Sequence, residues 1–285
     1  MSSGMSGSKK GVTRRDFLAK AMTTAALGAC VGSNIGGCTT CRPYKDAGSF
    51  EGNEPLFVET GVTNSYLIRC AGGFLLIDTS YPGEYDAFTA GLNSLGIDIS
   101  DIRYLLLTHH HDDHAGFASR LIKDTGAVLI VHEMALPYLE KGINEDISRP
   151  VNTCVNCLVS AYGLIHDFTY PPVVVSGKDH VISGDDTAYL RGIGIDGDII
   201  VTPGHTHDSI SILLDNHSAI VGDAAMNFMN LCLPGYRPIL VTDIDEVYES
   251  WEKLMNRGAR RIYPAHGRVF NAQKLAARIK EKHNG

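Results

Sequence analysis

Short apolar runs rich in β-branched residues alternate along the chain with longer stretches whose apolar residues recur at helical spacing. The short runs predict strands at residues 66–68, 74–77, 104–107, 128–131, 199–201, 210–214, 219–221 and 261–263. The longer stretches predict helices at residues 85–95, 115–125, 245–257 and 272–282. Because strands and helices alternate in sequence, the pattern predicts an α/β fold.

The pattern divides the chain into a leader and one folded domain. Residues 1–45 predict a leader and linker, and residues 46–285 predict a single domain. Residues 133–175 interrupt the alternation, so we expect an irregular insertion there, of the kind that often supplies substrate contacts. Its aromatic residues are explained equally well as substrate contacts or as a small core of the insertion; they are Tyr138, Tyr162, Phe168 and Tyr170.

The N-terminus has the layout of an export signal. A basic region ending in Arg14 and Arg15 precedes a small, weakly apolar stretch at 21–32. The segment around Arg14-Arg15-Asp16-Phe17-Leu18 resembles a twin-arginine signal, which implies the twin-arginine export machinery as a partner. A basic amphipathic helix is the alternative, but its glycines disfavour it. Cys30 and Cys38 each end a lipoprotein-like box, so the sequence leaves open a periplasmic protein or one anchored to the membrane through a lipid.

Composition and cysteine spacing narrow the chemistry. The 25 Lys+Arg and 32 Asp+Glu give a formal charge of −7, which argues against a nucleic-acid partner and favours a small-molecule substrate. Cys154 and Cys157 have the CxxC spacing, and export would place them in an oxidising compartment. We expect either a local disulfide between them or two inert thiols; a four-cysteine zinc site with Cys38 and Cys41 is the less favoured alternative.

The segment from His109 to His114 follows an apolar run and reads His-His-His-Asp-Asp-His. In an extended segment residues i and i+2 project to the same side, so His109 and His111 can reach one metal ion while His110 and Asp112 point away. Asp113 and His114 then suit a second, adjacent ion. Metal binding explains this concentration of ligand side chains better than a structural role does.

Four other ligand-type residues also follow predicted strands. They are Asp78, His205, Asp223 and His266, and glycine or proline flanks each of the last three. Loops at the carboxyl ends of strands converge in α/β folds, so we expect these residues to meet in one site. We assign Asp113 and Asp78 to the catalytic group, with Asp78 as an acceptor that orients a ligand histidine.

These motifs, in this order, resemble those of the metallo-β-lactamase superfamily over nearly the whole mature chain. The resemblance implies an αββα four-layer sandwich with a dinuclear metal site at one edge. It implies that His109, His111 and His205 hold the first ion, that Asp113, His114 and His266 hold the second, and that Asp223 bridges both. Nitrogen and oxygen ligands suit two zinc ions; manganese and iron remain alternatives. No organic cofactor is implied.

The expected reaction is hydrolysis, because two metal ions lower the pKa of shared water to ~7 and polarise a substrate oxygen. The bond would be an ester, thioester, lactone, amide or phosphodiester, with Asp113 accepting the proton.

Several subfamilies are disfavoured because this sequence departs from their residue patterns. Asp223 stands where the best-known zinc β-lactamases have Cys or Ser, and Met226 stands where lactonases have Tyr. We expect too little chain after His266 for the glutathione-binding region of glyoxalase II.

Alternatives from other classes stay open at this point. A mononuclear-iron dioxygenase that acts on a persulfide uses the same motif with fewer ligands engaged, and a zinc β-lactamase remains a minor alternative. A non-catalytic binding protein is disfavoured by the intact ligand set.

Overall fold

The computed structural model describes residues 54–146, 148–229, 232 and 235–284. The predicted export signal, both lipoprotein-like boxes and the linker lie outside the described residues. Within the described part, the helices are all too short or too polar to cross a membrane.

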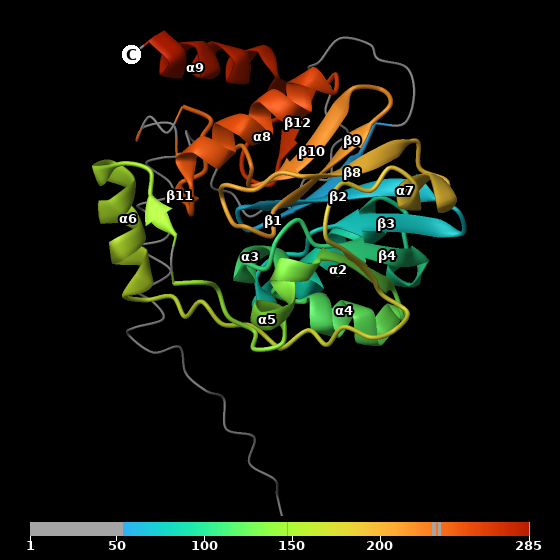
Figure 1. Ribbon diagram of the computed structural model, residues 1–285. Helices are drawn as coiled ribbons and strands as arrows, with labels where there is room; N and C mark the ends of the chain where they lie inside the picture. The colour runs from blue at the N-terminus through green and yellow to red at the C-terminus, as the bar shows by residue number, and fades with distance from the viewer. Residues whose placement is uncertain (1–53, 147, 230–231, 233–234, 285) are drawn as a thin grey trace, which may run out of the picture.

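Two β-sheets form the centre of the fold (Figure 1). The first has the order β1-β2-β3-β4-β5-β7, with strands Leu56–Thr60, Thr63–Cys70, Gly73–Ile77, Ile102–Leu106, Val128–His132 and His180–Ile182. The second has the order β13-β12-β10-β9-β8, with strands Phe270–Asn271, Arg261–Pro264, Ser218–Gly222, Ile210–Leu214 and Gly197–Val201. Strands β3, β4, β5 and β7 run parallel, as do β10 and β12. The parallel strands bring several loops to one edge of the sandwich.

Helices cover the outer face of each sheet, so three apolar layers separate four layers of structure (Figure 1). Helices α2 (Tyr85–Ser94) and α4 (Ala118–Thr125) pack on the first sheet, where Phe88 and Leu121 are fully buried. Helices α8 (Ile244–Asn256) and α9 (Gln273–Asn284) cover the second sheet. The predicted αββα sandwich is therefore confirmed.

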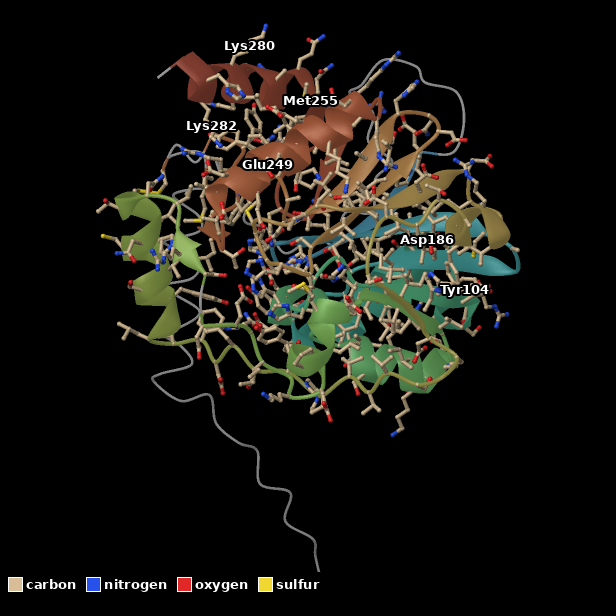
Figure 2. All side chains as sticks on the ribbon, viewed as in Figure 1. Tyr104, Asp186, Glu249, Met255, Lys280 and Lys282 are labelled. Atoms are coloured by element: carbon tan, nitrogen blue, oxygen red, sulfur yellow. A yellow bond between two sulfur atoms is a disulfide. The ribbon has the colours of Figure 1, made fainter. Side chains whose placement is uncertain are left out.

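Helix α9 shows how the 3.6-residue period selects the buried face. Leu275 and Ile279 are buried in the layer shared with α8, whereas Lys280 points away from the body of the protein (Figure 2). The Lys282 ammonium group lies 4.5 Å from the ring centroid of Tyr248 on α8, a cation–π contact between the two helices. The amphipathic pattern thus fixes how this helix sits on its neighbour.

The structure refines several predicted elements. The helix expected at 115–125 is broken into α3 (Asp112–Ala115) and α4. Gly116 lies at the break, where a Cβ atom would come within 2.4 Å of the carbonyl oxygen of Ser80. That close approach holds the end of the histidine motif against the loop after β3. The sequence pattern also missed β1 and β7.

The segment at 133–175 is more regular than expected. It contains α5 (Leu136–Leu139), the short strand β6 (Arg149–Pro150) and α6 (Thr153–Gly163), besides a 3-10 turn. The side chain of Asn152 accepts a hydrogen bond from Val155 N and so caps α6 at its N-terminus. Strand β6 pairs with β11 (Leu240–Val241), which attaches the insertion to the second half of the chain. The prediction of an irregular segment was wrong for α6.

The cysteine prediction was also wrong. Cys154 forms a disulfide with Cys232, 78 residues away, and Cys157 is an exposed free thiol. The disulfide joins α6 to the loop that follows Asp223, so it ties the insertion to the chain beyond β10. Asn152 Nδ2 donates to the carbonyl oxygen of Cys232 at 2.9 Å, which supports the same connection.

Removing this disulfide is expected to destabilise the fold. A disulfide that closes a loop of this length contributes about 4.5 kcal/mol in the chain-entropy model, and measured values are typically about 2–4 kcal/mol. Cys154→Ala should therefore lower the free energy of unfolding in urea by about 2–4 kcal/mol, whereas Cys157→Ala should change it little. Adding a reductant should remove the difference between the two variants. Equal stability of both variants under oxidising conditions would contradict the pairing.

Candidate metal centre

Five loops at the ends of strands bring the candidate ligands together. Asp78 follows β3, the motif from His109 to His114 follows β4, His205 follows β8, Asp223 follows β10, and His266 follows β12. All of these side chains are at least four-fifths buried. Residues up to 188 positions apart in sequence therefore meet at one edge of the sandwich (Asp78 and His266).

The first ligand group consists of His109, His111 and His205. His205 Nε2 lies 3.1 Å from His109 Nε2 and 3.1 Å from His111 Nδ1. Two nitrogens bound to one tetrahedral zinc ion at about 2.0–2.1 Å lie roughly 3.3 Å apart. The three nitrogens are therefore spaced as ligands of one ion.

The second ligand group consists of Asp113, His114 and His266. Asp113 Oδ2 lies 3.1 Å from His266 Nε2, and Asp113 Oδ1 lies 3.7 Å from His114 Nε2. Among the buried side-chain nitrogen and oxygen atoms of the described residues, His114 Nε2 is one of the few without a hydrogen-bond partner. Since buried polar atoms normally have partners, this atom is available to a metal ion.

Asp223 lies between the two groups. Its Oδ1 is 3.5 Å from His114 Nε2 and 3.4 Å from His266 Nε2, while its Oδ2 is 3.6 Å from His205 Nε2. One oxygen thus faces each group, which is the arrangement that a bridging carboxylate requires. Gly222, just before it, has φ +51°, and a Cβ there would lie 2.3 Å from Thr108 Oγ1. Glycine therefore lets the loop bring Asp223 close to the histidine motif.

Each of the five candidate ligand histidines is held through its other ring nitrogen. The partners are Thr108 Oγ1 for His109 (3.1 Å), Glu145 for His111 (2.7 Å), Asp78 for His114 (2.9 Å), Leu240 O for His205 (2.7 Å) and Val62 O for His266 (2.9 Å). All five partners can accept a hydrogen bond, so in the neutral form of each ring the opposite nitrogen presents its lone pair to the site.

Asp78 carries more than one of these contacts. Its Oδ2 accepts from Thr108 Oγ1 at 2.7 Å and lies 2.9 Å from His114 Nδ1, and its Oδ1 accepts from Thr108 N at 2.7 Å. Because Thr108 donates its proton to Asp78, its oxygen is left to accept from His109. The structure therefore places Asp78 behind the ligands as a residue that orients both groups.

Electrostatics differ between the two groups. Burial lowers the pKa of His109 well below its usual value, and the neighbouring rings lower it further. Burial also lowers the pKa of His205 to about 4, with a contribution from His111. These two rings stay neutral at pH 7, which is the form that binds a metal ion.

In the second group, charge outweighs burial. Burial alone would lower the pKa of both His114 and His266. The carboxylates of Asp113 and Asp223 outweigh burial and raise the pKa of His266 to about 10. The same two carboxylates, together with Asp78, raise the pKa of His114 well above its usual value. The same ion pairs lower the pKa of Asp113 and Asp223, although burial opposes this. The two carboxylates therefore attract positive charge, and a metal cation would displace the protons from both rings.

His110 and Asp112 point away from the ligand groups, as expected. His110 Nδ1 lies 2.9 Å from Asp208 Oδ1, and its ring stacks on Tyr138 with centroids 4.1 Å apart. Asp112 Oδ2 lies 2.6 Å from His166 Nε2. Burial lowers the pKa of His110, but the carboxylates of Asp208 and Glu145 outweigh it and raise this pKa to about 9. His110 is therefore a buried cation between two anions.

Sequence reasoning missed Glu145 and Asp208. Glu145 Oε2 lies 2.6 Å from His110 Nε2 and 2.7 Å from His111 Nε2. The contact with His111 is a hydrogen bond, whereas the contact with His110 is an ion pair. Both separations are shorter than the roughly 3.3 Å between two ligands of one zinc ion, so charge and hydrogen bonding hold this cluster together. Asp208 comes three residues after His205, but its sequence position does not reveal its partner. Glu145 lies in the insertion, where the sequence offers no ligand motif.

The aromatic residues of the insertion support the histidine motif. Tyr138 stacks on His110, and Tyr170 donates its hydroxyl proton to the carbonyl oxygen of His110. Tyr162 stacks on His166, the partner of Asp112, and the ring centroids of Tyr162 and Phe168 are 6.0 Å apart. These aromatic residues thus form part of a small core of the insertion, as one of the two explanations from the sequence proposed. The same residues also pack against the histidine motif.

A family model described as the metallo-beta-lactamase superfamily matches residues 58–266. The chain belongs to the metallo-β-lactamase superfamily. Its curated relatives include a beta-lactamase-like protein 2 homolog of Caenorhabditis elegans, 26% identical over 219 residues, which are 77% of this chain and 60% of the relative. A probable metallo-hydrolase of Methanocaldococcus jannaschii is 27% identical over 212 residues, which are 73% of this chain and 88% of that protein.

Solved structures agree on the fold of this superfamily member. A metallo-β-lactamase family protein of Thermus thermophilus has a TM-score of 0.57 at 20% identity, covering 78% of this chain and 75% of that one. A subclass B3 metallo-β-lactamase of Bradyrhizobium japonicum has a TM-score of 0.55 at 21% identity, covering 81% and 90%. The chain spans about three fifths of the length of several curated relatives that it matches.

Proposed function

We propose that the protein is a dinuclear hydrolase that cleaves an ester, thioester, lactone, amide or phosphodiester bond of a small molecule. The observation that carries the proposal is the position of Asp223, which presents one oxygen to each of two buried ligand groups. Zinc fits the nitrogen and oxygen donors best. Two bound ions would lower the pKa of a shared water to ~7 and polarise the substrate oxygen.

Asp113 is the residue best placed to take a proton from that water. Its side chain is 16% exposed, against 0% for His114 and 5% for His266 and Asp223, so it is the side chain of the second group that solvent reaches most. Although burial opposes it, the neighbouring histidines lower the pKa of Asp113, so its carboxylate is ionised. Oδ2 lies 3.1 Å from His266 Nε2 and would be the oxygen that binds the second ion, and Oδ1 would accept the proton and pass it to the leaving group.

A turnover screen tests this function directly. Zinc-loaded protein starting at residue 46 would be offered esters, thioesters, lactones, amides including β-lactams, and phosphodiesters. The proposal expects hydrolysis of at least one class and loss of that activity on chelation, with recovery when zinc is restored. Turnover of a persulfide with oxygen uptake, and of none of these classes, would support the dioxygenase alternative instead.

We further propose that the protein is exported through the twin-arginine route, on the basis of Arg14 and Arg15. This route carries folded proteins, so the metal centre would be loaded in the cytoplasm, where metal availability helps to select the ion.

Replacing both arginines with lysine is expected to trap the precursor in the cytoplasm, folded and metal-loaded. Cells expressing each form would be fractionated, and protein and metal measured in both compartments. Unimpaired export of the double-lysine variant would refute the route and leave the metal centre unaffected.

A further inference from the structure

The insertion contacts the histidine motif at consecutive positions. Asn144 Oδ1 accepts from Asp112 N at 2.9 Å, and Asn144 Nδ2 donates to Asp112 Oδ1 at 2.8 Å. The next residue, Glu145, reaches the rings of His110 and His111 with a single oxygen. Two adjacent residues of the insertion therefore fix both the backbone and the side chains of the motif.

Glu145 is itself held in place. Its side chain is 3% exposed, and Ser148 donates a hydrogen bond to Oε1, the oxygen that does not face the histidines. Oε2 is thereby directed at His111 Nε2. A proton on Nε2 that is donated to this carboxylate leaves Nδ1 as the lone-pair nitrogen of His111, which is the atom that faces His205 at 3.1 Å.

The insertion also supports His205, a second histidine of the first ligand group. Strand β6, four residues after Glu145, pairs with β11, where Pro150 is the partner of Leu240. The Leu240 carbonyl oxygen accepts from His205 Nδ1 at 2.7 Å. The two histidines of the second ligand group are oriented instead by Asp78 and Val62, which lie before the insertion.

We propose that Glu145 is a positioning residue that fixes the tautomer and direction of His111 and thereby sets the affinity of the first metal group selectively. The inference rests on the proposed dinuclear centre. Partners of this kind behind a metal-binding histidine change affinity by about 10–100-fold when removed. The insertion then supports the ligands of one of the two ions.

The test compares zinc affinities at the two groups. Apo-protein would be titrated with zinc against a chromophoric chelator, giving two dissociation constants for the wild type. His111→Ala and His266→Ala each remove one nitrogen and so identify which constant belongs to which group. Glu145→Ala should weaken the first group by about 10–100-fold and leave the second within about twofold. Glu145→Gln, which retains an acceptor oxygen without the charge, should lie between wild type and Glu145→Ala.

Asp146→Ala is the matched control, because it removes an exposed carboxylate one residue away. It should leave both constants unchanged. Circular dichroism of each apo-variant establishes that it folds, and Glu145→Gln preserves the shape of the side chain if Glu145→Ala does not. The positioning role would be overturned if the wild type has two zinc sites and Glu145→Ala leaves both dissociation constants unchanged or raises both equally. A third zinc site lost in Glu145→Ala would overturn it in favour of a ligand role. Fewer than two sites in the wild type would instead overturn the dinuclear proposal.

Discussion

Replacing His111 with alanine is expected to abolish turnover and to release the ion of the first group. The change removes one of three nitrogens that lie within ligand spacing of each other. Metal ions stabilise hydrolytic transition states by several kcal/mol, and each 1.36 kcal/mol is a tenfold change in rate, so kcat/KM should fall by about 10³-fold or more. Metal content by mass spectrometry and kcat/KM would be measured on the same preparation.

Its neighbour His110 provides the contrast. His110→Ala leaves the carboxylates of Asp208 and Glu145 buried without the cation between them, and removing one partner of a buried ion pair costs about 3–5 kcal/mol. We expect a lower free energy of unfolding in urea, with both ions retained in the folded protein. His110→Gln, which can still donate a hydrogen bond, should be less destabilised. Equal metal loss from His111→Ala and His110→Ala would contradict the orientation seen in the structure.

Replacing Asp223 with alanine is the second large effect expected. Asp223 is the carboxylate that faces both groups, so its loss removes the ligand that two ions would share. The variant should lose one or both ions and, with them, several kcal/mol of transition-state stabilisation, or about 10²–10³-fold in kcat/KM. Asp223→Asn, which retains one oxygen, should lose less.

Asp215→Ala serves as the control for this change. Asp215 pairs on the surface with Arg191 and lies outside the ligand groups, so its loss should leave metal content and kcat/KM close to wild type. Full metal content and full activity in Asp223→Ala would show that this residue does not bridge two ions.

The strands and the candidate ligands could be predicted because their signals are local. The ligand residues follow apolar strands, and the carboxyl ends of parallel strands meet at one edge, so the convergence of His109, His205 and His266 follows from topology. The break at Gly116 has no such signal, since it depends on the distance to Ser80, a contact between two loops. Strand β7 was missed because three residues are too few to show a period.

The support of the centre could not be predicted because it depends on long-range pairing. Nothing near Glu145 marks it as the partner of His111, 34 residues earlier, and the CxxC spacing of Cys154 drew attention to Cys157 rather than to Cys232. A cysteine pairing cannot be deduced from spacing alone. Helix α6 was missed for a similar reason: it buries Val155 deeply but leaves much of its surface exposed, so its amphipathic signal is weak.

The central claim is that two ions act together in one centre, and the metal content of active wild-type protein tests it most directly. Protein purified without added metal would be analysed by mass spectrometry for zinc, manganese and iron, and its turnover followed as metal is removed and restored. The proposed centre predicts about two divalent ions per chain, with activity that requires both. Full activity with a single tightly bound iron per chain would contradict it.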